Sequence, residues 1–380
     1  MKQNKNKVAW IATLLLLLFV SNPCFLYAED VKETKVKLVA DGPYLFYENN
    51  DQIRSISITA EEQIIDTVYQ VNQGKFTFPV YSHEGKFLFE TEVRPEISRD
   101  HWQIDQAKKV FVTSDPHGDF DTFADLLKTN KVIDEKYNWT YGKNQLVVIG
   151  DVFDRGKDVL PLFWLVYKLE AEAAKKGGQV VFLLGNHEPM VLGGDLRYVK
   201  KSYLAFAEKL GVPYESLFGP TSVLGDWLHT KNTIQLIGDN LFVHAGISAD
   251  LVERGYTIPQ VNKIVSDGLF YHRKIRKKQS DDLDFLYGNR GPIWYRGMVR
   301  DKEKYNPITP IEVNNVLAYF NVERIIVGHT IFPEISHFFD KRVIAVNLNN
   351  KKNKINKGTR ALLIKKNKFW IVSDASLVRL

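Results

Sequence analysis

The chain is predicted to be an α/β protein whose sheets are covered by helices, with a small β-rich domain ahead of them. From residue 109 onward, near-continuous apolar segments such as VFVT and LVVIG alternate with amphipathic helical patterns, which is typical of buried strands between helices. Residues 29–105 instead contain short aromatic and β-branched runs separated by turn sequences such as NND and HEG. A length of 380 residues, 44% of them hydrophobic and 25% charged, suits a large folded domain with a smaller companion.

The N-terminal segment, residues 1–28, is predicted to be a secretory signal peptide. Three lysines and no acid precede the 13-residue apolar run VAWIATLLLLLFV, and the polar segment SNPCFLYAED follows it. This run is too short to span a membrane comfortably, and we expect cleavage after Ala28, although Leu26 is bulkier than the small residue usual at its position. We therefore expect a periplasmic or secreted protein that has no membrane association after cleavage. An uncleaved N-terminal anchor is the alternative.

Charge and cysteine content argue against several classes of function. Removing residues 1–28 takes away three lysines and no acid, so the formal charge falls from +6 to +3. The basic runs at 272–278 and 351–357 are interpreted as solvated faces, so no nucleic-acid partner is expected. The single cysteine, Cys24, lies inside the predicted signal peptide. The mature chain is thus predicted to have no disulfide, no cysteine nucleophile and no thiolate metal site.

The other elements are predicted in order along the chain. Strands of the β-rich accessory domain, 29–105, are expected at PYLFYEN, QIRSISI, KFTFPVYS and KFLFETEV. The main domain, 106–380, is expected to begin with three strand–helix pairs: KVFVTSD with DTFADLLKT, NQLVVIGD with DVLPLFWLVYKLEAEAAKK, and QVVFLLGN with LRYVKKSYLAFAEKLG. Further strands are expected in TIQLIGDNLFVHAG, RIIVGHT, RVIAVN and KFWIVSD.

Polar side chains follow five of these predicted strands. They are Asp115 and His117, Asp151 and Asp154, Asn186 and His187, His244, and His329. A single aspartate after a strand is usually a turn or a helix cap, and a single histidine near a glycine usually makes a structural hydrogen bond. Five strands that all end in this way indicate one ligand-binding edge. Converging carboxylates repel one another unless cations neutralise them, and oxygen and nitrogen ligands without sulfur suit manganese, iron or zinc.

The number of these ligands predicts two divalent metal ions. One ion would take Asp115, His117 and a shared Asp151, and the other would take Asp151, Asn186, His244 and His329. A bridging carboxylate brings two cations to about 4 Å, the spacing at which they clamp an in-line phosphoryl displacement and generate hydroxide at neutral pH.

The segments DPHGD, GDVFDRG, GNHE, VHAG and VGHT, in this order over 115–330, resemble the calcineurin-like metallophosphoesterases of the phosphoprotein phosphatase superfamily. The resemblance implies that the catalytic domain, 106–380, is a sandwich of two mixed β-sheets flanked by helices. The segments GNHEPMVLGGDLRYV and GPIWYRG are similar to the bacterial Shewanella-like branch, of the protein-tyrosine-phosphatase type. The chain departs from eukaryotic serine/threonine phosphatases at Leu184, where they have arginine, at HAG for their HGG, and at VGHT for their RAH.

Residue roles follow from this resemblance. Metal-bound hydroxide would attack phosphorus directly, and His187 would protonate the leaving oxygen while Asp154 holds its ring. Arg155 and Arg296 would donate hydrogen bonds to the phosphate oxygens, unless they serve in structural salt bridges instead. Asn186 would be both a metal ligand and a phosphate neighbour.

Three further acidic and basic residues belong to the same motifs. Asp195 and Arg197 form part of the branch signature. Their role is either an ion pair that fixes the loop or a contact with the substrate. Asp119 is interpreted as the N-cap of the following helix.

The function that the sequence predicts is a metal-dependent phosphomonoesterase acting on phosphoproteins or phosphopeptides. Phosphotyrosine is favoured as substrate, with phosphoserine and phosphothreonine as alternatives, and manganese is the favoured metal. VHAGI at 243–247 also occurs in symmetrical dinucleoside polyphosphate hydrolases, which are the second candidate. A non-catalytic interaction protein on a phosphatase scaffold is the third, although every expected ligand is present. The motifs specify no oligomeric state.

Overall fold

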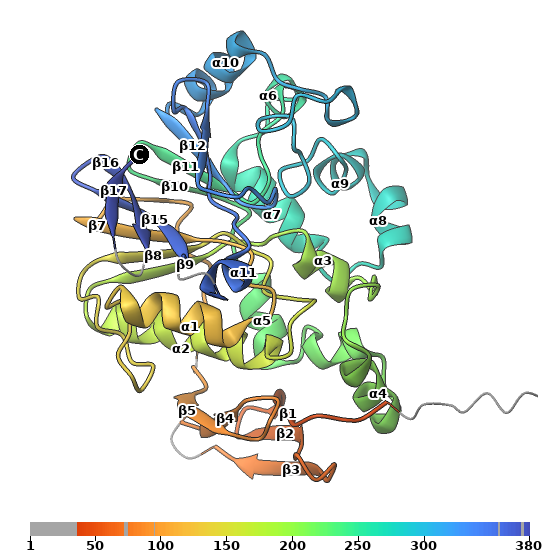
Figure 1. Cartoon of the computed structure of the whole chain (residues 1–380). Helices are drawn as coiled ribbons and strands as arrows, with labels where there is room; N and C mark the ends of the chain where they lie inside the picture. Colours follow the sequence, from red (N-terminus) through yellow and green to blue (C-terminus); the bar gives the residue numbers. More distant parts are fainter. Residues whose placement is uncertain (1–35, 72–74, 95, 356–357, 374–375) are drawn as a thin grey trace, which may run out of the picture. The chain divides into compact units, whose positions relative to one another are not determined.

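The computed structural model describes residues 36–380 apart from 72–74, 95, 356–357 and 374–375 (Figure 1). Residues from Val36 onward form one compact unit. The predicted signal peptide lies outside the described residues, so it stays a prediction of the sequence. Among the helices of the described part of the chain, none combines the length and the apolar character needed to cross a membrane.

Two small antiparallel sheets precede the main part of the fold. The first contains β1 (Asp41–Asn49), β2 (Gln52–Ile58) and β3 (Ile64–Gln70), and the second contains β4 (Thr77–Tyr81) and β5 (Phe87–Glu92). The sequence patterns predict four of these strands. They miss β3, because most of its side chains are exposed and its segment IIDTVYQ has no clean alternation of apolar and polar residues.

The main part is a sandwich of two six-stranded mixed sheets, as predicted. One sheet has the order β17 (Leu377–Arg379), β16 (Lys368–Ser373), β15 (Arg360–Lys365), β7 (Lys109–Thr113), β8 (Gln145–Val148), β9 (Gln179–Phe182). The other has the order β13 (Ser336–Phe338), β14 (Val343–Ala345), β12 (Arg324–Val327), β11 (Asn240–Val243), β10 (Ile234–Ile237), β6 (Gln103–Ile104). Strands β7, β8 and β9 are parallel, and so are β11, β12 and β14.

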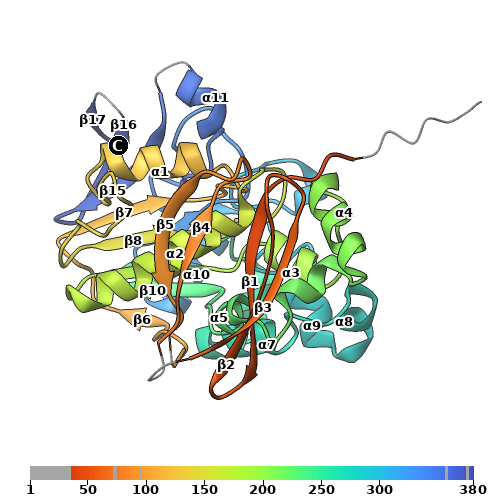
Figure 2. The same ribbon diagram turned by 90° about the horizontal axis from the view of Figure 1, so that it is seen from below.

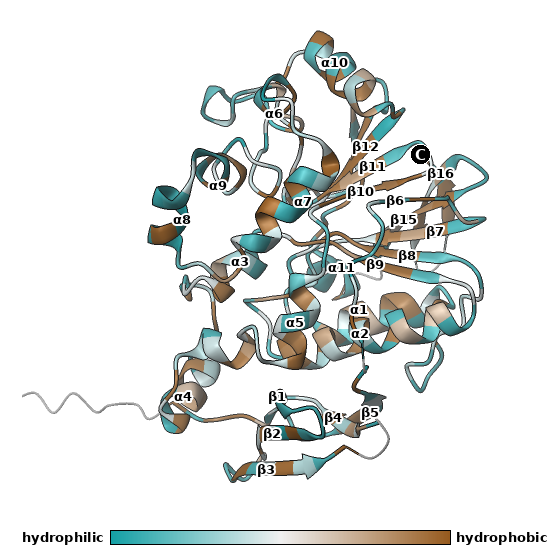
Figure 3. Ribbon diagram, turned by 180° about the vertical axis from the view of Figure 1, so that it is seen from behind, coloured by the Kyte–Doolittle hydropathy of each residue, from teal (hydrophilic) through white to brown (hydrophobic). Residues whose placement is uncertain are grey.

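Alternate side chains of each strand fill the space between the two sheets. Val112 of β7 and Val147 of β8 share a buried cluster with Phe242 of β11 and Ile326 of β12. Their neighbours along the strands, such as Phe111, belong instead to the larger core beneath the helices. Because side chains of a strand point alternately to its two faces, strands buried on both faces are apolar throughout, which explains the continuous apolar runs in the sequence (Figure 3).

Helices cover the outer faces of the sandwich. They are α1 (Phe120–Thr129), α2 (Val159–Lys175), α3 (His187–Leu192), α4 (Lys201–Leu210), α5 (Val223–His229), α6 (Ala249–Glu253), α7 (Ile258–Asp267), α8 (Arg273–Gln279), α9 (Asp281–Leu286), α10 (Pro310–Phe320) and α11 (Asn350–Ile355). The helix expected over LRYVKKSYLAFAEKLG begins only at Lys201. The residues of the predicted segment before Lys201 are not helical, because the carbonyl oxygen of Tyr198 accepts a hydrogen bond from the Arg155 N–H (3.1 Å) and not from a helical turn.

Helix α2 lies between the sandwich and the N-terminal sheets (Figure 1), and it is buried from Val159 to Leu169. Seen from below, strands β4 and β5 lie across it (Figure 2). The Trp164 indole packs edge-on against Phe78 with ring centroids 4.7 Å apart, and its Nε1–H donates to the Pro43 carbonyl (3.1 Å). The N-terminal sheets therefore share one hydrophobic core with the main sheets. The boundary at residues 105 and 106 stays a prediction.

The buried carboxyl of Asp41 makes stability depend on pH. Gly42 N–H (3.0 Å) and the Tyr44 hydroxyl donate to it, yet burial raises the pKa of Asp41 to about 7. The folded chain therefore keeps a proton that the unfolded chain releases near pH 4, so stability falls as the pH rises from about 4 to 7. We expect Asp41→Asn to gain on the wild type by up to about 4 kcal/mol between pH 4 and pH 8 in urea unfolding. A difference between the two proteins that does not change with pH would contradict a protonated Asp41.

Candidate active site

The ends of five strands, three from one sheet and two from the other, bring the predicted site residues together. They form two sets, and within each set the ligand atoms all lie within 4.8 Å of one another. The first set is His117, Asp151 and His187, and the second is Asp151, His244 and His329. Asp151 belongs to both sets, so it is placed where a shared ligand would be. Strands β7, β8 and β9 are parallel and so end at one edge of their sheet, where loops converge on ligands.

The three ligand atoms of the second set and the Asn186 oxygen face one another. His244 Nε2 lies 3.2 Å from Asp151 Oδ2, 3.1 Å from Asn186 Oδ1 and 3.2 Å from His329 Nδ1. His244 Nδ1 is 2.8 Å from the Ile149 carbonyl, so one ring proton is donated there, and Nε2 would turn its lone pair to a bound cation. Ligands about 2.0–2.1 Å from a tetrahedral cation are themselves about 3.3 Å apart. The spacing therefore fits a bound divalent cation.

The first set is looser, and it differs from the predicted ligands in one residue. It contains His187, the predicted proton donor, where the prediction has Asp115. His117 Nε2 lies 3.8 Å from Asp151 Oδ2, while His117 Nδ1 is 2.9 Å from the Phe153 carbonyl. Asp115 is in neither three-residue set, and its Oδ2 accepts the backbone N–H of His329 (3.0 Å). That contact joins the loop after β7 to the loop after β12.

The site contains buried carboxylates that a cation would stabilise. Burial, with the nearby Asp151 carboxylate, raises the pKa of Asp115 to about 7. For His244, burial alone would lower the pKa, but the carboxylates of Asp151 and Asp115 outweigh it and raise the pKa to about 9. In addition, His329 Nε2 is buried and has no hydrogen-bond partner within the described residues. Divalent metal ions would neutralise these carboxylates, so the donor set fits them.

The site residues share a strained backbone conformation. Six of them have positive φ: Asp115 (51°), His117 (43°), Asp151 (58°), Asp154 (73°), Arg155 (64°) and His329 (59°). This region is sparsely populated by residues other than glycine, and such strain persists only where the surroundings enforce it. The clustering of this strain at the ends of the strands indicates that the loops are shaped to aim these side chains.

Glu188, for which the sequence motifs predict no role, enforces this conformation around Asp151. Its carboxylate is 0% exposed and accepts the backbone N–H groups of Asp151 (3.0 Å), Val152 (2.8 Å) and Gly185 (2.7 Å). A carboxylate has two acceptor oxygens and no donor, so it can accept several such bonds at once. The available signal was its position as the last residue of GNHE.

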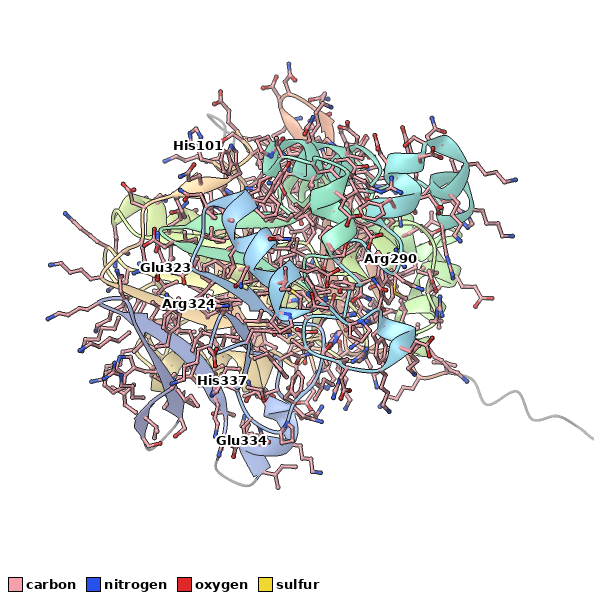
Figure 4. All side chains as sticks on the ribbon, turned by 90° about the horizontal axis from the view of Figure 1, so that it is seen from above. His101, Arg290, Glu323, Arg324, Glu334 and His337 are labelled. Carbon is pink, nitrogen blue, oxygen red and sulfur yellow. The ribbon has the colours of Figure 1, made fainter. Side chains whose placement is uncertain are left out.

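Replacing Glu188 by glutamine tests this role. The amide NH₂ would face a backbone N–H, so we expect Glu188→Gln to lower the free energy of unfolding by about 1–3 kcal/mol and to weaken metal binding roughly 10- to 100-fold. Urea unfolding and metal titration measure the two effects. The matched control is Glu334→Gln, an exposed residue (Figure 4) paired with Arg360, for which we expect a change within about 0.5 kcal/mol. Equal effects at the two positions would contradict the role of Glu188.

His187 is placed as a proton donor. Its Nδ1 lies 2.5 Å from Asp154 Oδ2, and the carboxylates of Asp151 and Asp154 raise its pKa although burial opposes them. Its Nε2 lies 3.2 Å from Arg155 Nη2, so in this state the imidazole accepts a hydrogen bond from the guanidinium. A phosphate group would attract Arg155 away from His187 and free Nε2 to carry a proton.

The second predicted phosphate-binding arginine also reaches the site. Arg296 Nη1 donates to Thr330 Oγ1 (2.9 Å), next to the metal-site residue His329. Burial lowers the pKa of Arg296 from its ordinary value, while the carboxylates of Asp115 and Asp151 act in the opposite direction. A guanidinium held beside the ligand sets can contact a phosphate bound to the cations.

The structure gives a role to Asp195 and Arg197, which the sequence left open, and it shows how Asp119 differs from a helix cap. Arg197 Nε donates to Asp195 Oδ1 (2.8 Å), so these two residues form an ion pair within their own loop. Asp119 stands at the N-cap position of α1, as predicted, but its side chain makes no capping hydrogen bond in the described structure. The side chain lies instead in a cavity of about 210 Å³ beside Asp115, and its Oδ2 has no partner among the described residues.

The N-terminal sheets contact the loops of the site through His83. His83 Nδ1 lies 2.9 Å from Asp158 Oδ2, and His83 N–H donates to Asp158 Oδ1 (2.7 Å). Asp158 N–H donates in turn to the carbonyl of Gly118, next to the ligand His117 (3.0 Å). The turn between β4 and β5 is therefore connected to both loops that carry site residues of β7 and β8.

Parallel strand ends with two ligand sets that share one aspartate, a buried histidine–aspartate pair and two arginines define a metal-dependent phosphoesterase, a hydrolase. The sequence model of the calcineurin-like phosphoesterases matches residues 108–333, more than half of the chain. The chain belongs to this family.

Two named relatives support the Shewanella-like resemblance. The crystal structure of a cold-active protein tyrosine phosphatase of a psychrophilic Shewanella species is similar with a TM-score of 0.80 and 34% identity, over 90% of this chain and 99% of that one. Shewanella-like protein phosphatase 2 of Arabidopsis thaliana is 26% identical over 67% of this chain and 74% of its own length. An uncharacterised protein of Schizosaccharomyces pombe is 34% identical, and the match spans 58% of this chain and 66% of that protein.

Proposed function

We propose that this protein is a phosphomonoesterase that removes phosphate from phosphoproteins or phosphopeptides, with phosphotyrosine as the favoured residue. The observation that carries the proposal is the buried His187–Asp154 pair, which lies beside two ligand sets joined by Asp151. The name of the Shewanella relative, a protein tyrosine phosphatase, supports the choice of phosphotyrosine.

The predicted residues would hold two cations, one by Asp115, His117 and Asp151, and one by Asp151, Asn186, His244 and His329. When bound, divalent cations such as manganese, or iron or zinc, lower the pKa of a coordinated water to supply hydroxide and neutralise phosphate charge.

The chain's own residues would handle the phosphate and the leaving group. Arg155 and Arg296 would each donate two hydrogen bonds to phosphate oxygens and orient the ester for in-line attack. The oxygen of water would bond to phosphorus as the ester P–O bond breaks, without a phosphoenzyme. His187 would transfer the proton on Nε2 to the departing oxygen, and Asp154 would keep the ring oriented and stabilise its charged form.

Phosphate release from matched phosphotyrosine and phosphoserine peptides tests the proposal. We expect release to stop after chelation, to return when manganese, iron or zinc is added, and to be faster from the phosphotyrosine peptide. Turnover restricted to a dinucleoside polyphosphate would support the nucleotide alternative. A protein that binds metal but releases phosphate from none of these would support the non-catalytic alternative.

Localisation is a separate proposal. The segment 1–28 supports export to the periplasm or beyond, because it has the charge and apolar pattern of a signal peptide. Mass spectrometry of the protein from the exported fraction tests it, and a chain that keeps residue 1 in the cytoplasmic fraction would contradict it.

A further inference from the structure

Tyr198 is a large aromatic residue at the edge of the candidate site, and it has no role in the proposed chemistry. We infer that Tyr198 forms an aromatic wall against which the phenyl ring of a phosphotyrosine substrate packs, so that it favours aryl over alkyl phosphates. The inference rests on the proposed function and identifies the part of the substrate that the site would select.

The position of Tyr198 beside the reacting groups carries this inference. Its ring centroid lies 5.5 Å from that of His187, with the two planes at 45°. The Arg155 N–H donates to the Tyr198 carbonyl (3.1 Å), and the Arg155 guanidinium carbon lies 5.7 Å from the Tyr198 ring centroid. Tyr198 thus borders both the proton donor and a phosphate-binding arginine.

The depths of the two rings place the leaving group against Tyr198. His187 is 3% exposed, whereas Tyr198 next to it is 45% exposed. In the proposed arrangement, the group bonded to the oxygen that His187 protonates extends from this buried position towards solvent, and Tyr198 is the exposed ring that borders His187. A phenyl ring spans that depth and offers a flat face to the tyrosine. The single methylene of phosphoserine offers no such face, and it would draw the peptide backbone into the site.

The loop that carries Tyr198 is held in place before a substrate binds. The Arg197 guanidinium carbon lies 5.7 Å from the Tyr198 ring centroid, and Arg197 is ion-paired with Asp195. Arg273 Nη1 of α8 reaches the same carboxylate at 3.5 Å, which ties the loop to a second helix. A wall that is already ordered costs little entropy when a ring packs on it. Aromatic pairs with centroids 4.5–7 Å apart change a rate or binding ratio by roughly twofold to tenfold.

The test compares kcat/KM for two peptides of one sequence, one with phosphotyrosine and one with phosphoserine. We expect Tyr198→Leu to lower the ratio of phosphotyrosine to phosphoserine kcat/KM by about twofold to tenfold. Tyr198→Phe should keep the wild-type ratio, because it keeps the ring. The matched control is Tyr319→Leu on α10, where the tyrosine has a similar exposure of 42%, and it should also keep the ratio. Tyr198→Met is a second variant in case Tyr198→Leu does not fold.

The outcomes separate the inference from the proposed function. An unchanged ratio in Tyr198→Leu or Tyr198→Met, with phosphotyrosine still hydrolysed by the wild type, overturns the role of Tyr198 alone. The same loss in Tyr198→Phe would also overturn it, since the hydroxyl and not the ring would then be responsible. If the metal-loaded wild type releases no phosphate from the phosphotyrosine peptide, the proposed function and this inference both fall.

Discussion

Replacing His187 by asparagine is expected to lower kcat for phosphopeptides by about 10²- to 10⁴-fold, because the leaving oxygen loses its proton donor. The loss should be smaller for aryl phosphates whose leaving group has a low pKa, because these departing oxygens need less protonation. Steady-state kinetics over a series of substituted phenyl phosphates measures both effects.

The control and the metal content decide how this result is interpreted. His101→Asn, at an exposed position (Figure 4), should have wild-type activity. Because His187 Nε2 lies 3.9 Å from Asp151 Oδ2, His187 could instead hold a metal ion. Elemental analysis after dialysis should find the same metal content in His187→Asn as in the wild type. Loss of metal together with activity, or an equal loss for all leaving groups, would contradict the assignment of His187 as the acid.

Replacing Asp151 by asparagine is expected to weaken metal binding at both ligand sets by at least about 100-fold and to abolish phosphate release at micromolar metal. Asp151 Oδ2 lies 3.2 Å from His244 Nε2 and 3.8 Å from His117 Nε2, so one side chain serves both sets. Loss of an outer partner of a ligand typically costs 10- to 100-fold in affinity, and loss of a shared charged ligand should cost more. Metal titration followed by calorimetry measures the affinity, and activity is followed as metal is added.

The matched control for this substitution is Asp239→Asn. Asp239 is exposed and precedes β11 at the end opposite His244, so its change should leave metal content and activity at wild-type values. If Asp151→Asn bound two equivalents of metal with wild-type affinity, Asp151 would not bridge the two sets. Loss of only one equivalent would assign Asp151 to a single ion.

The sandwich and the cluster of ligands are predictable because both depend on local patterns. Strands buried on both faces must be apolar throughout, and the polar residues that follow parallel strands must meet at one sheet edge. This is why Asp151, Asn186, His244 and His329 lie together as predicted. Strands β3, β13 and β17 have no such pattern, because they are partly exposed or only three residues long.

The fold class, the family resemblance and the identity of the residues at the strand ends can all be predicted from the amino-acid sequence. Which of these residues touch, and what holds them in place, depends on contacts between distant segments of the fold. Glu188 binds backbone groups up to 37 positions away, and His83 contacts Asp158 across 75 positions. The Asp119 side chain lies in a cavity instead of capping its helix. These outcomes depend on how distant segments pack. Hydrophobic periodicity reports only how each segment meets its own neighbours and the core, so it carries no information about such pairings.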